Sequence, residues 1–157
     1  MDCRSCMSPV TTRLYADQPA GTVIDFMRKH HMELVPVVDR EDKFVGLLSA
    51  EKLMRMLLPR SIGMMRNIKH ASYLRETSED LQERLDDIRL QPTADLVSTY
   101  AQTVHPEAAL SDALMAISER QYIVPVVDDE GVLIGAISYF SIMHAMEALD
   151  KGGNNTP

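Results

Sequence analysis

Residues 35–39 of the chain read VPVVD, and residues 124–128 read VPVVD again, at an offset of 89 residues. With the same offset, GLLS at 46–49 aligns with GAIS at 135–138, so that a Gly and a Ser recur at matching positions. Chance could supply one shared pentapeptide, but further matching residues in register with it indicate a repeat. The sequence therefore contains a duplicated module, and this duplication decides the fold.

Both copies of the module are expected to form a helix, two strands of a hairpin and a second helix, in that order. Apolar residues at helical spacing predict the helices, and short runs rich in β-branched residues predict the strands. In copy one we expect a helix at 23–27, strands at 34–38 and 44–48, and a helix at 50–58. In copy two we expect a helix at 110–117, strands at 123–127 and 133–137, and a helix at 140–149. An extra short strand is expected near 10–15 and near 102–105. Gly46 and Gly135 lie inside the second strands, which predicts a bulge or a close backbone approach.

The two copies are assigned to residues 1–58 and 93–149, and the stretch 59–92 between them is long for a linker. That stretch holds two apolar stripes at helical spacing, so we expect an amphipathic helical insertion. The stripes consist of Ile62, Met65 and Ile68 and of Leu81, Leu85 and Ile88. The tail at 150–157, which contains KGGNNTP, is expected to be disordered.

The repeated VPVVD, the polar turn after it and the following GLLS or GAIS resemble the CBS-domain family, over about 1–58 and 93–149. The resemblance implies an α/β fold of the α+β type, in which two βαββα repeats pack as a pseudo-two-fold pair known as a Bateman module. Such tandems usually form homodimers, bind adenine nucleotides or related adenosyl ligands, and act as regulators rather than enzymes. The implied function is to bind AMP, ADP, ATP or S-adenosylmethionine between the repeats and to signal, through altered packing, to a protein partner whose identity the sequence does not give.

The resemblance also implies two composite clefts, each lined by residues of both copies. The first cleft would use Thr11, Met32, Glu33, Leu34, Ser138 and Ser141. The second cleft would use Ser49, Lys52, Thr99, Thr103, Gln121, Tyr122 and Ile123. In the second cleft, Lys52 could meet a phosphate as a point charge and Tyr122 could stack on a base. Lys52 could equally be a solvated helix residue, and Tyr122 a partly buried core residue.

At two positions the chain departs from the family pattern. The family has an Asp that accepts hydrogen bonds from the ribose hydroxyls six residues after the strand Gly, and this sequence has Lys52 and Ser141 there. The Ser of the pattern is retained as Ser49 and Ser138. Glu51 comes one residue early and is expected to point elsewhere, because neighbouring helix positions differ by about 100°. A scaffold or protein-interaction module with empty, degenerate clefts is therefore the alternative function.

Charge and composition narrow the set of partners. The chain has 16 basic and 23 acidic residues, a net charge of −7, and only three Phe, five Tyr and no Trp. Proteins that follow a phosphate backbone usually present a basic face or a row of stacking aromatics, so no nucleic-acid partner is expected. Residues 93–157 carry two basic and nine acidic groups, and an anionic ligand would meet a repulsive field there unless a cation intervened. Asp128, Asp129 and Glu130 could recruit Mg²⁺, but acidic residues in a turn are more often solvated, and no metal site is predicted.

The N-terminal sequence and the cysteines bear on location and on catalysis. No apolar run approaches the roughly 18 residues that span a bilayer, no secretory leader is recognisable, and two cysteines make no disulfide framework. A cytoplasmic protein without a membrane partner is therefore expected. Cys3 and Cys6 form a single CxxC motif, whereas a structural zinc site needs four ligands. A small redox or metal enzyme built on these thiols is a rival hypothesis; otherwise they lie on a mobile leader.

Two further features remain open at this stage. No nucleophile with a base and an orienting group is visible, so no catalytic residues are predicted and the protein is not expected to be an enzyme. The chain has 11 methionines, among them Met54, Met143 and Met146 in expected helices. Methionine fills irregular cores and also populates adaptable contact surfaces. Core packing is the main interpretation, and a face for a dimer or partner is the alternative.

Overall fold

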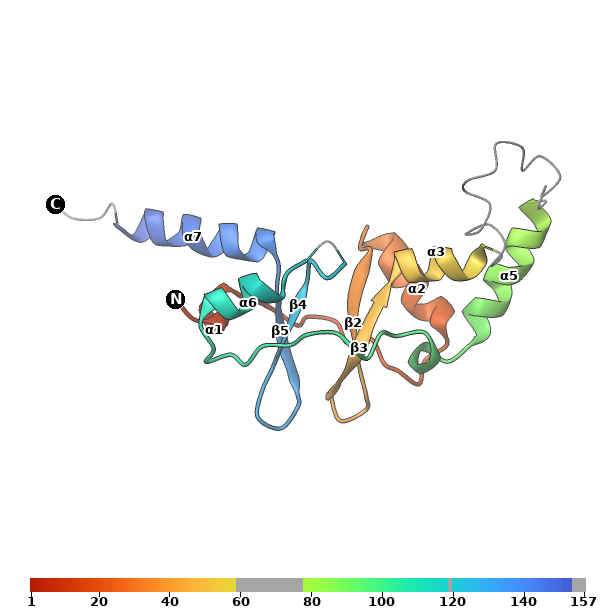
Figure 1. The fold of residues 1–157 in the computed structure, drawn as a ribbon, viewed down its shortest axis with the longest axis horizontal. Helices are drawn as coiled ribbons and strands as arrows, with labels where there is room; N and C mark the ends of the chain where they lie inside the picture. Colours follow the sequence, from red (N-terminus) through yellow and green to blue (C-terminus); the bar gives the residue numbers. More distant parts are fainter. Residues whose placement is uncertain (59–77, 119, 154–157) are drawn as a thin grey trace.

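The computed structural model describes residues 1–58, 78–118 and 120–153. Two β-hairpins stand side by side at the centre of the molecule, and the helices lie outside them (Figure 1). The expected apolar stripe of Ile62, Met65 and Ile68 lies outside the described residues, as does the end of the expected tail at 154–157.

The two copies contain the helices and the hairpin expected for each of them. In the first copy these are α2 (Ala20–Lys29), β2 (Leu34–Val38), β3 (Phe44–Ser49) and α3 (Ala50–Leu57). In the second copy they are α6 (Leu110–Ala116), β4 (Val124–Val127), β5 (Leu133–Ile137) and α7 (Tyr139–Gly153). The remaining described elements are α1 (Cys3–Cys6), β1 (Ser8–Pro9), α5 (Ser78–Leu90) and the 3-10 helix η2 (Thr93–Asp95). The α+β organisation with a duplicated module is confirmed.

The structure corrects two expectations from the sequence, which concern the extra short strands and the C-terminal tail. The extra short strands near 10–15 and 102–105 reduce to single parallel bridges, at Tyr15 and Val104, because the chain turns directly after each of them. The expected disordered tail is helical up to Gly153, where α7 ends. Lys151 stands in the last turn of α7, where a cation interacts favourably with the helix dipole.

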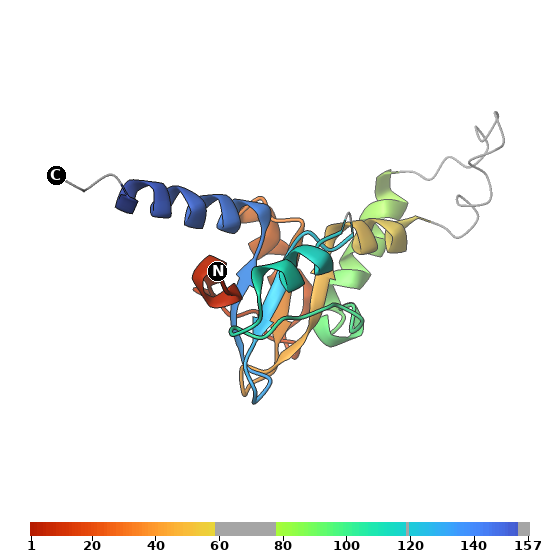
Figure 2. The same cartoon turned by 60° about the vertical axis from the view of Figure 1, so that its left-hand side comes forward.

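Each hairpin is antiparallel, and the two hairpins repeat one another in detail. β2 and β3 form a two-stranded sheet, whereas β4 and β5 belong to a three-stranded sheet of order β1-β5-β4. The register shifts at the same place in both hairpins, next to Val38 and next to Val127, which confirms the expected irregularity. The two hairpins are joined because Phe44 N donates to Gly131 O at 3.0 Å and Leu133 N donates to Asp42 O at 3.0 Å. Both hairpin turns therefore lie together at one end of the molecule (Figure 2).

The two repeats exchange segments of chain. β1 comes from the N-terminus but pairs with β5 of the second repeat, and α1 packs against α6 and α7. In return, Ser98 pairs with Leu47 of β3, through hydrogen bonds of 2.8 and 3.1 Å. The sequence ranges 1–58 and 93–149 therefore do not coincide with the packed units, because short extended segments without periodicity do not reveal their partners.

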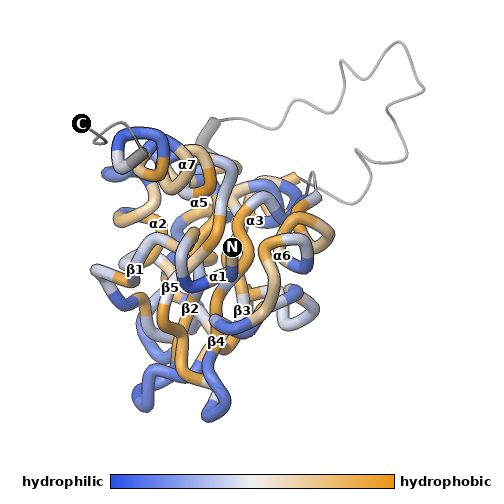
Figure 3. The backbone as a smooth tube through the Cα atoms, turned by 90° about the vertical axis from the view of Figure 1, so that its left-hand side faces the viewer, coloured by the Kyte–Doolittle hydropathy of each residue, from blue (hydrophilic) through white to orange (hydrophobic). Residues whose placement is uncertain are grey.

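Two hydrophobic cores result from this exchange, and their strands form the apolar centre of the molecule (Figure 3). The first core includes Ile88 of α5 together with Leu96 and Val97 from the segment after it. The second core includes Cys3 and Cys6 of α1. Each core is thus completed by residues that the sequence places outside the corresponding repeat.

The N-terminal cysteines are structural rather than mobile. Cys3 and Cys6 are 0% and 1% exposed, and burial raises the pKa of both thiols. Asp2 caps the short helix that carries them, because its carboxylate accepts from Ser5 N at 2.9 Å. The expected mobile leader is therefore wrong. Among the described residues no group of three or more His, Cys, Asp or Glu could hold a metal ion.

The described part of the insertion is the amphipathic helix α5, as expected. Ile88 is buried in the first core and Leu85 packs against it. Arg89 donates to both carboxylate oxygens of Asp25 at 2.9 Å, and this hydrogen bonding lowers the pKa of Asp25. Arg84 donates to Leu57 O at 2.8 Å, at the end of α3. In the described residues no helix combines the length and apolar character needed to cross a membrane.

The close backbone approach at Gly46 makes a direct prediction. A Cβ on Gly46 would collide with the carbonyl group of Ser98, which is held by its hydrogen bonds to β3. Replacing Gly46 with Ala should therefore lower the free energy of unfolding by about 1–3 kcal/mol, as measured by urea denaturation. Gly152→Ala is the matched control, because nothing lies within 4 Å of that position and Ala favours a helix. Equal stability of Gly46→Ala and the unmodified protein would contradict the close approach.

Candidate functional site

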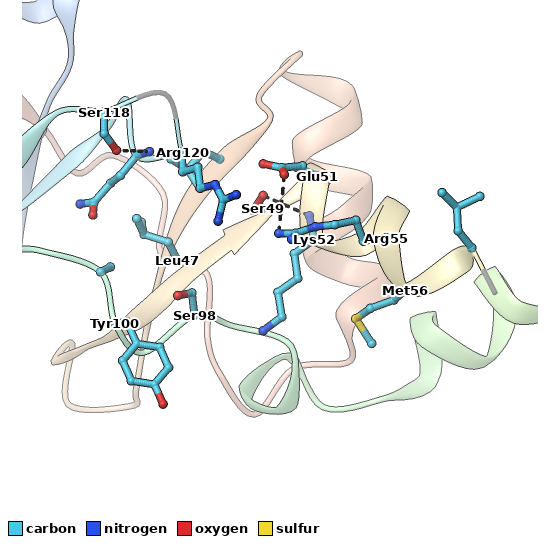
Figure 4. A pocket seen from close by; sticks show the side chains of 14 residues that line it. Leu47, Ser49, Glu51, Lys52, Arg55, Met56, Ser98, Tyr100, Ser118 and Arg120 are labelled. Atoms are coloured by element: carbon cyan, nitrogen blue, oxygen red, sulfur yellow. Dashed lines mark hydrogen bonds and ion pairs between the residues drawn. The ribbon is translucent and has the colours of Figure 1, made fainter. Parts of the chain in front are cut away.

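A large cavity lies between the two repeats. It has a volume of about 770 Å³ and is bordered by α3 and β3 on one side and by Ser98, Tyr100, Ala101, Ser118, Arg120 and Gln121 on the other (Figure 4). Its lining residues are Leu34, Leu47, Ser49, Glu51, Lys52, Arg55, Met56, Leu58, Ser98, Tyr100, Ala101, Ser118, Arg120 and Gln121. We call it the cationic cleft, because basic side chains outnumber acidic ones along it.

Among the described residues, three cations and one carboxylate line the cationic cleft. Lys52 and Arg55 come from α3 of the first repeat, whereas Arg120 comes from the second repeat. Lys52 Nζ donates to Val97 O at 3.4 Å, and Glu51 pairs with Arg55 at 3.6 Å. Lys52 and Arg120 enter the cavity from opposite sides (Figure 4). Such an arrangement favours an anion that bridges the repeats, because charge-assisted hydrogen bonds are the strong ones.

This local field differs from the one expected from the sequence. The acidic residues of 93–157 predicted repulsion of an anion. Among the residues of that segment that the structure describes, however, the only charged one that lines the cationic cleft is Arg120. The acidic Asp128, Asp129 and Glu130 lie instead in the hairpin turn between β4 and β5. Net charge along a sequence segment therefore does not give the field at a cleft, which depends on where each side chain lies.

Some residues expected in this second cleft are found there and others are not. Ser49, Lys52 and Gln121 line it, as expected. Thr99 and Thr103 are not among its lining residues, and the neighbouring Ser98 and Tyr100 line it instead. Residues 99 and 100 form a turn after Ser98, so no strand alternation fixed in the sequence tells which of these side chains faces the cavity.

The recurring serines have a structural role. Ser49 Oγ accepts from Lys52 N at 3.3 Å, and Ser138 Oγ accepts from Ser141 N at 3.2 Å. Both hydroxyls therefore sit at the start of a helix as caps. Ser141 is buried, and its hydroxyl donates to Ser138 O at 3.0 Å. The expectation that Ser141 lines the first cleft is wrong, because its side chain turns back onto the preceding backbone.

The first expected cleft is also present, and it shares Leu34 with the cationic cleft. It has a volume of about 490 Å³, and we call it the aromatic cleft after the rings of Tyr122, Tyr139 and Phe140. Its lining residues are His31, Met32, Glu33, Leu34, Tyr122, Ile123, Ser138, Tyr139 and Phe140. Met32, Glu33, Leu34 and Ser138 are thus brought together as expected, whereas Thr11 lines a smaller chamber of about 180 Å³ that shares Met32 and Ile123 with this cleft.

Tyr122 and Ile123 line the aromatic cleft and not the cationic cleft, where they were expected. Gln121 immediately before them faces the cationic cleft, so this extended segment passes between the two cavities. Burial and the neighbouring charge of Glu33 raise the pKa of Tyr122. Tyr122, the ring expected to stack on a base beside Lys52, therefore lines the aromatic cleft instead.

The cationic cleft is also lined by three residues that were not predicted from the sequence, Arg55, Arg120 and Glu51. Arg55 could have been found, because it follows Lys52 by three positions and so lies on the same helix face. No spacing in the sequence identifies Arg120 as a cleft residue, since only the fold brings it opposite α3. The expectation that Glu51 points away is wrong, because the cationic cleft extends over the first turn of α3, where Glu51 lies.

The fold and its two composite clefts define a tandem of small α+β modules. The model of the CBS-domain family matches residues 3–59 and 93–148, and the chain belongs to this family. Among curated proteins, an uncharacterized protein of Methanocaldococcus jannaschii, MJ1426, is 25% identical over 145 residues, which cover 85% of this chain and 84% of that protein.

Solved structures share the same fold at low identity. The CBS-pair protein CBSX2 from Arabidopsis thaliana superposes with a TM-score of 0.71 at 19% identity, covering 96% of each chain. Its structure in complex with AMP gives a TM-score of 0.67 at 17% identity over 95% of this chain and 98% of that one. The structure of CbpB in complex with c-di-AMP gives 0.68 at 19% identity over 99% and 90%. CbpB has also been solved from Streptococcus agalactiae.

Proposed function

We propose that the protein is a cytoplasmic regulatory module that binds an adenine nucleotide in the cationic cleft and passes the signal to a protein partner through altered packing of its repeats. The observation that carries this proposal is the placement of Lys52, Arg55 and Arg120, from both repeats, around one 770 Å³ cavity. A phosphate needs cations or hydrogen-bond donors, and a ring needs an apolar wall. Leu34, Leu47 and other apolar side chains supply that wall.

Two relatives of the same fold support the class of ligand. CBSX2 was solved with AMP and CbpB with c-di-AMP. Both molecules combine adenine with phosphate, which is the combination that an apolar wall with adjacent cations can hold. The chain lacks the family carboxylate for ribose, because Lys52 occupies that position. Phosphate contacts should therefore contribute a larger share of the affinity here.

The same geometry indicates how binding could change the structure. Arg120 belongs to the second repeat, and Lys52 and Arg55 belong to the first, so their like charges repel one another unless an anion lies between them. An anion between them removes that repulsion and favours the arrangement in which the repeats lie closest. A ligand shifts an equilibrium only by its differential affinity for the two states. The repeats should therefore pack more tightly when the nucleotide is bound.

Removing either cation should weaken nucleotide binding. Lys52→Gln and Arg120→Gln are each expected to raise the dissociation constant for ATP about tenfold or more, because a hydrogen bond to a charged group contributes about 1.5–3 kcal/mol. Isothermal titration calorimetry measures the change. Lys151→Gln, near the end of α7, is the matched control and should bind ATP like the unmodified chain. The dissociation constant for adenosine, which has no phosphate, should differ little between the variants and the unmodified protein.

The scaffold function with empty clefts is the competing outcome. It would be supported if AMP, ADP, ATP and S-adenosylmethionine all left the thermal unfolding temperature unchanged at about 1 mM. Binding at 100 times the dissociation constant adds about 2.7 kcal/mol to the free energy of unfolding, so a ligand of useful affinity could not escape detection. Unchanged ATP affinity in both cleft variants would show that these cations do not hold the phosphates.

We also propose that the protein forms a homodimer. Met143, Met146 and Leu149 on α7 are 49%, 55% and 61% exposed, and Met54 on α3 is 56% exposed, so core packing does not explain these methionines. α7 also projects away from the body of the molecule (Figure 2). An exposed apolar surface of this kind typically marks a contact with another chain, and a second copy is the partner that the family resemblance implies.

Charges on this face should separate the copies. Met143→Glu combined with Met146→Glu is expected to convert a dimer into a monomer in analytical ultracentrifugation, because two carboxylates would be buried without partners. Glu147→Gln, on the same helix, is the control and should leave the mass unchanged. A monomeric mass for the unmodified protein would contradict the homodimer.

A further inference from the structure

The short helices α1 and η2 occupy corresponding places beside the two cores. Cys3 N, at the start of α1, donates to Ala108 O at 2.9 Å, just before α6. Thr93 N, at the start of η2, donates to Gln18 O at 2.9 Å, just before α2. The two donors and the two acceptors are separated by the same offset of 90 residues. The fold therefore makes Thr93 the counterpart of Cys3.

The first core fills the positions of both cysteines without a thiol. Thr93 is 0% exposed, and its hydroxyl donates to a backbone carbonyl at 2.8 Å, as the thiol of Cys3 does at 3.5 Å. Leu96, the counterpart of Cys6 at the same offset, is 1% exposed and belongs to the first core. A hydroxyl and an aliphatic side chain thus pack where the second core has two thiols. Packing alone therefore does not explain a CxxC pair at this place.

We propose that Cys3 and Cys6 form a reversible intramolecular disulfide by exchange with a small-molecule disulfide such as glutathione disulfide. One cysteine thiolate attacks the glutathione disulfide and displaces a glutathione thiolate, and the other then attacks the mixed disulfide and displaces the second. The protein loses two electrons and two protons, and one glutathione disulfide becomes two glutathione thiols. This inference goes beyond the proposed function, because it concerns the second core and needs no nucleotide.

The spacing of the two cysteines permits the bond but does not leave α1 unchanged. Residues three apart in a helix have Cα atoms about 5 Å apart, which lies within the range of about 4.4–6.8 Å found in disulfides. Their Cβ atoms, however, are about 5–6 Å apart, whereas a disulfide brings them to about 3.8 Å. The turn of α1 must therefore change when the bond forms, and both sulfurs must shift from their places in the second core.

The buried thiols become reactive when α1 opens locally. The helix has four residues and the strand β1 after it has two. Arg4 pairs with Glu107 at 2.8 Å, but these side chains are 55% and 61% exposed. Short terminal elements of this kind open at a smaller free energy than the whole fold. Because burial raises the pKa of both thiols, the closed protein is protected and the opened segment is not. The disulfide thus records the undocking of the exchanged N-terminal segment.

Thiol counting on the full chain provides the test. The protein is incubated with mixtures of glutathione and glutathione disulfide, and the remaining thiols are alkylated and counted by mass spectrometry. We expect both thiols to be lost together, with no glutathione attached. Cys3→Ser and Cys6→Ser should each retain one bound glutathione, because the second thiolate that displaces it is missing. In the oxidised protein, amide hydrogen exchange in α1 and β1 should be about tenfold faster or more.

Cys3→Thr combined with Cys6→Leu is the matched control, because it copies the counterparts in the first core. It should fold, and its hydrogen exchange should not respond to glutathione disulfide. A double variant that does not fold would show that packing requires the thiols and would overturn the inference. Two glutathione adducts on the unmodified chain, two thiols that stay reduced, or a disulfide that leaves hydrogen exchange unchanged would also overturn it. ATP binding is measured on the reduced protein, so failure of either proposal is seen separately.

Discussion

The exchange of short segments between the repeats is the interaction on which the rest of the structure depends. β1 leaves the N-terminus to pair with β5 of the second repeat, and Ser98 returns to pair with β3 of the first. Each hairpin alone is a marginal unit, since two strands in water are rarely stable without a third strand or a packed helix. Because each core needs residues from the other half of the chain, the repeats cannot separate without exposing both cores. The clefts between them are therefore permanent features of the fold.

This constraint explains why the clefts are composite and chemically different. The segment around 121–123 passes between the cavities, so that Gln121 faces one and Tyr122 the other. The duplicated hairpins give the clefts a similar frame, with a capping Ser at the start of the following helix on each side. The side chains added to that frame differ. Lys52 and Arg55 stand on α3, whereas Tyr139 and Phe140 stand on α7, and these choices give one cleft positive charge and the other aromatic faces.

Much of this fold could be predicted from the repeated VPVVD and the aligned glycines, because hairpins and helices are local patterns. The sequence predicts a bulge or a close backbone approach at Gly46, and the structure has a register shift beside it and a close approach to it. Its partner Ser98 could not be predicted, since only tertiary pairing brings the two together. The burial of Cys3 and Cys6 could not be predicted either, because it also depends on tertiary contacts. In the site, the resemblance to the CBS-domain family pointed to the position of Lys52, and Arg55 could then have been found because it lies three positions later on the same helix. Arg120 and the inward turn of the Ser141 hydroxyl depend on contacts that no spacing encodes.

The most direct measurement of the central claim is a crystal structure of the protein with ATP. We expect the nucleotide to lie between the repeats, with phosphate oxygens within hydrogen-bonding distance of Lys52 Nζ and of the Arg120 guanidinium. Adenine should then contact the apolar wall that includes Leu34 and Leu47. Density for ATP elsewhere on the protein, with the cationic cleft filled only by water, would contradict it.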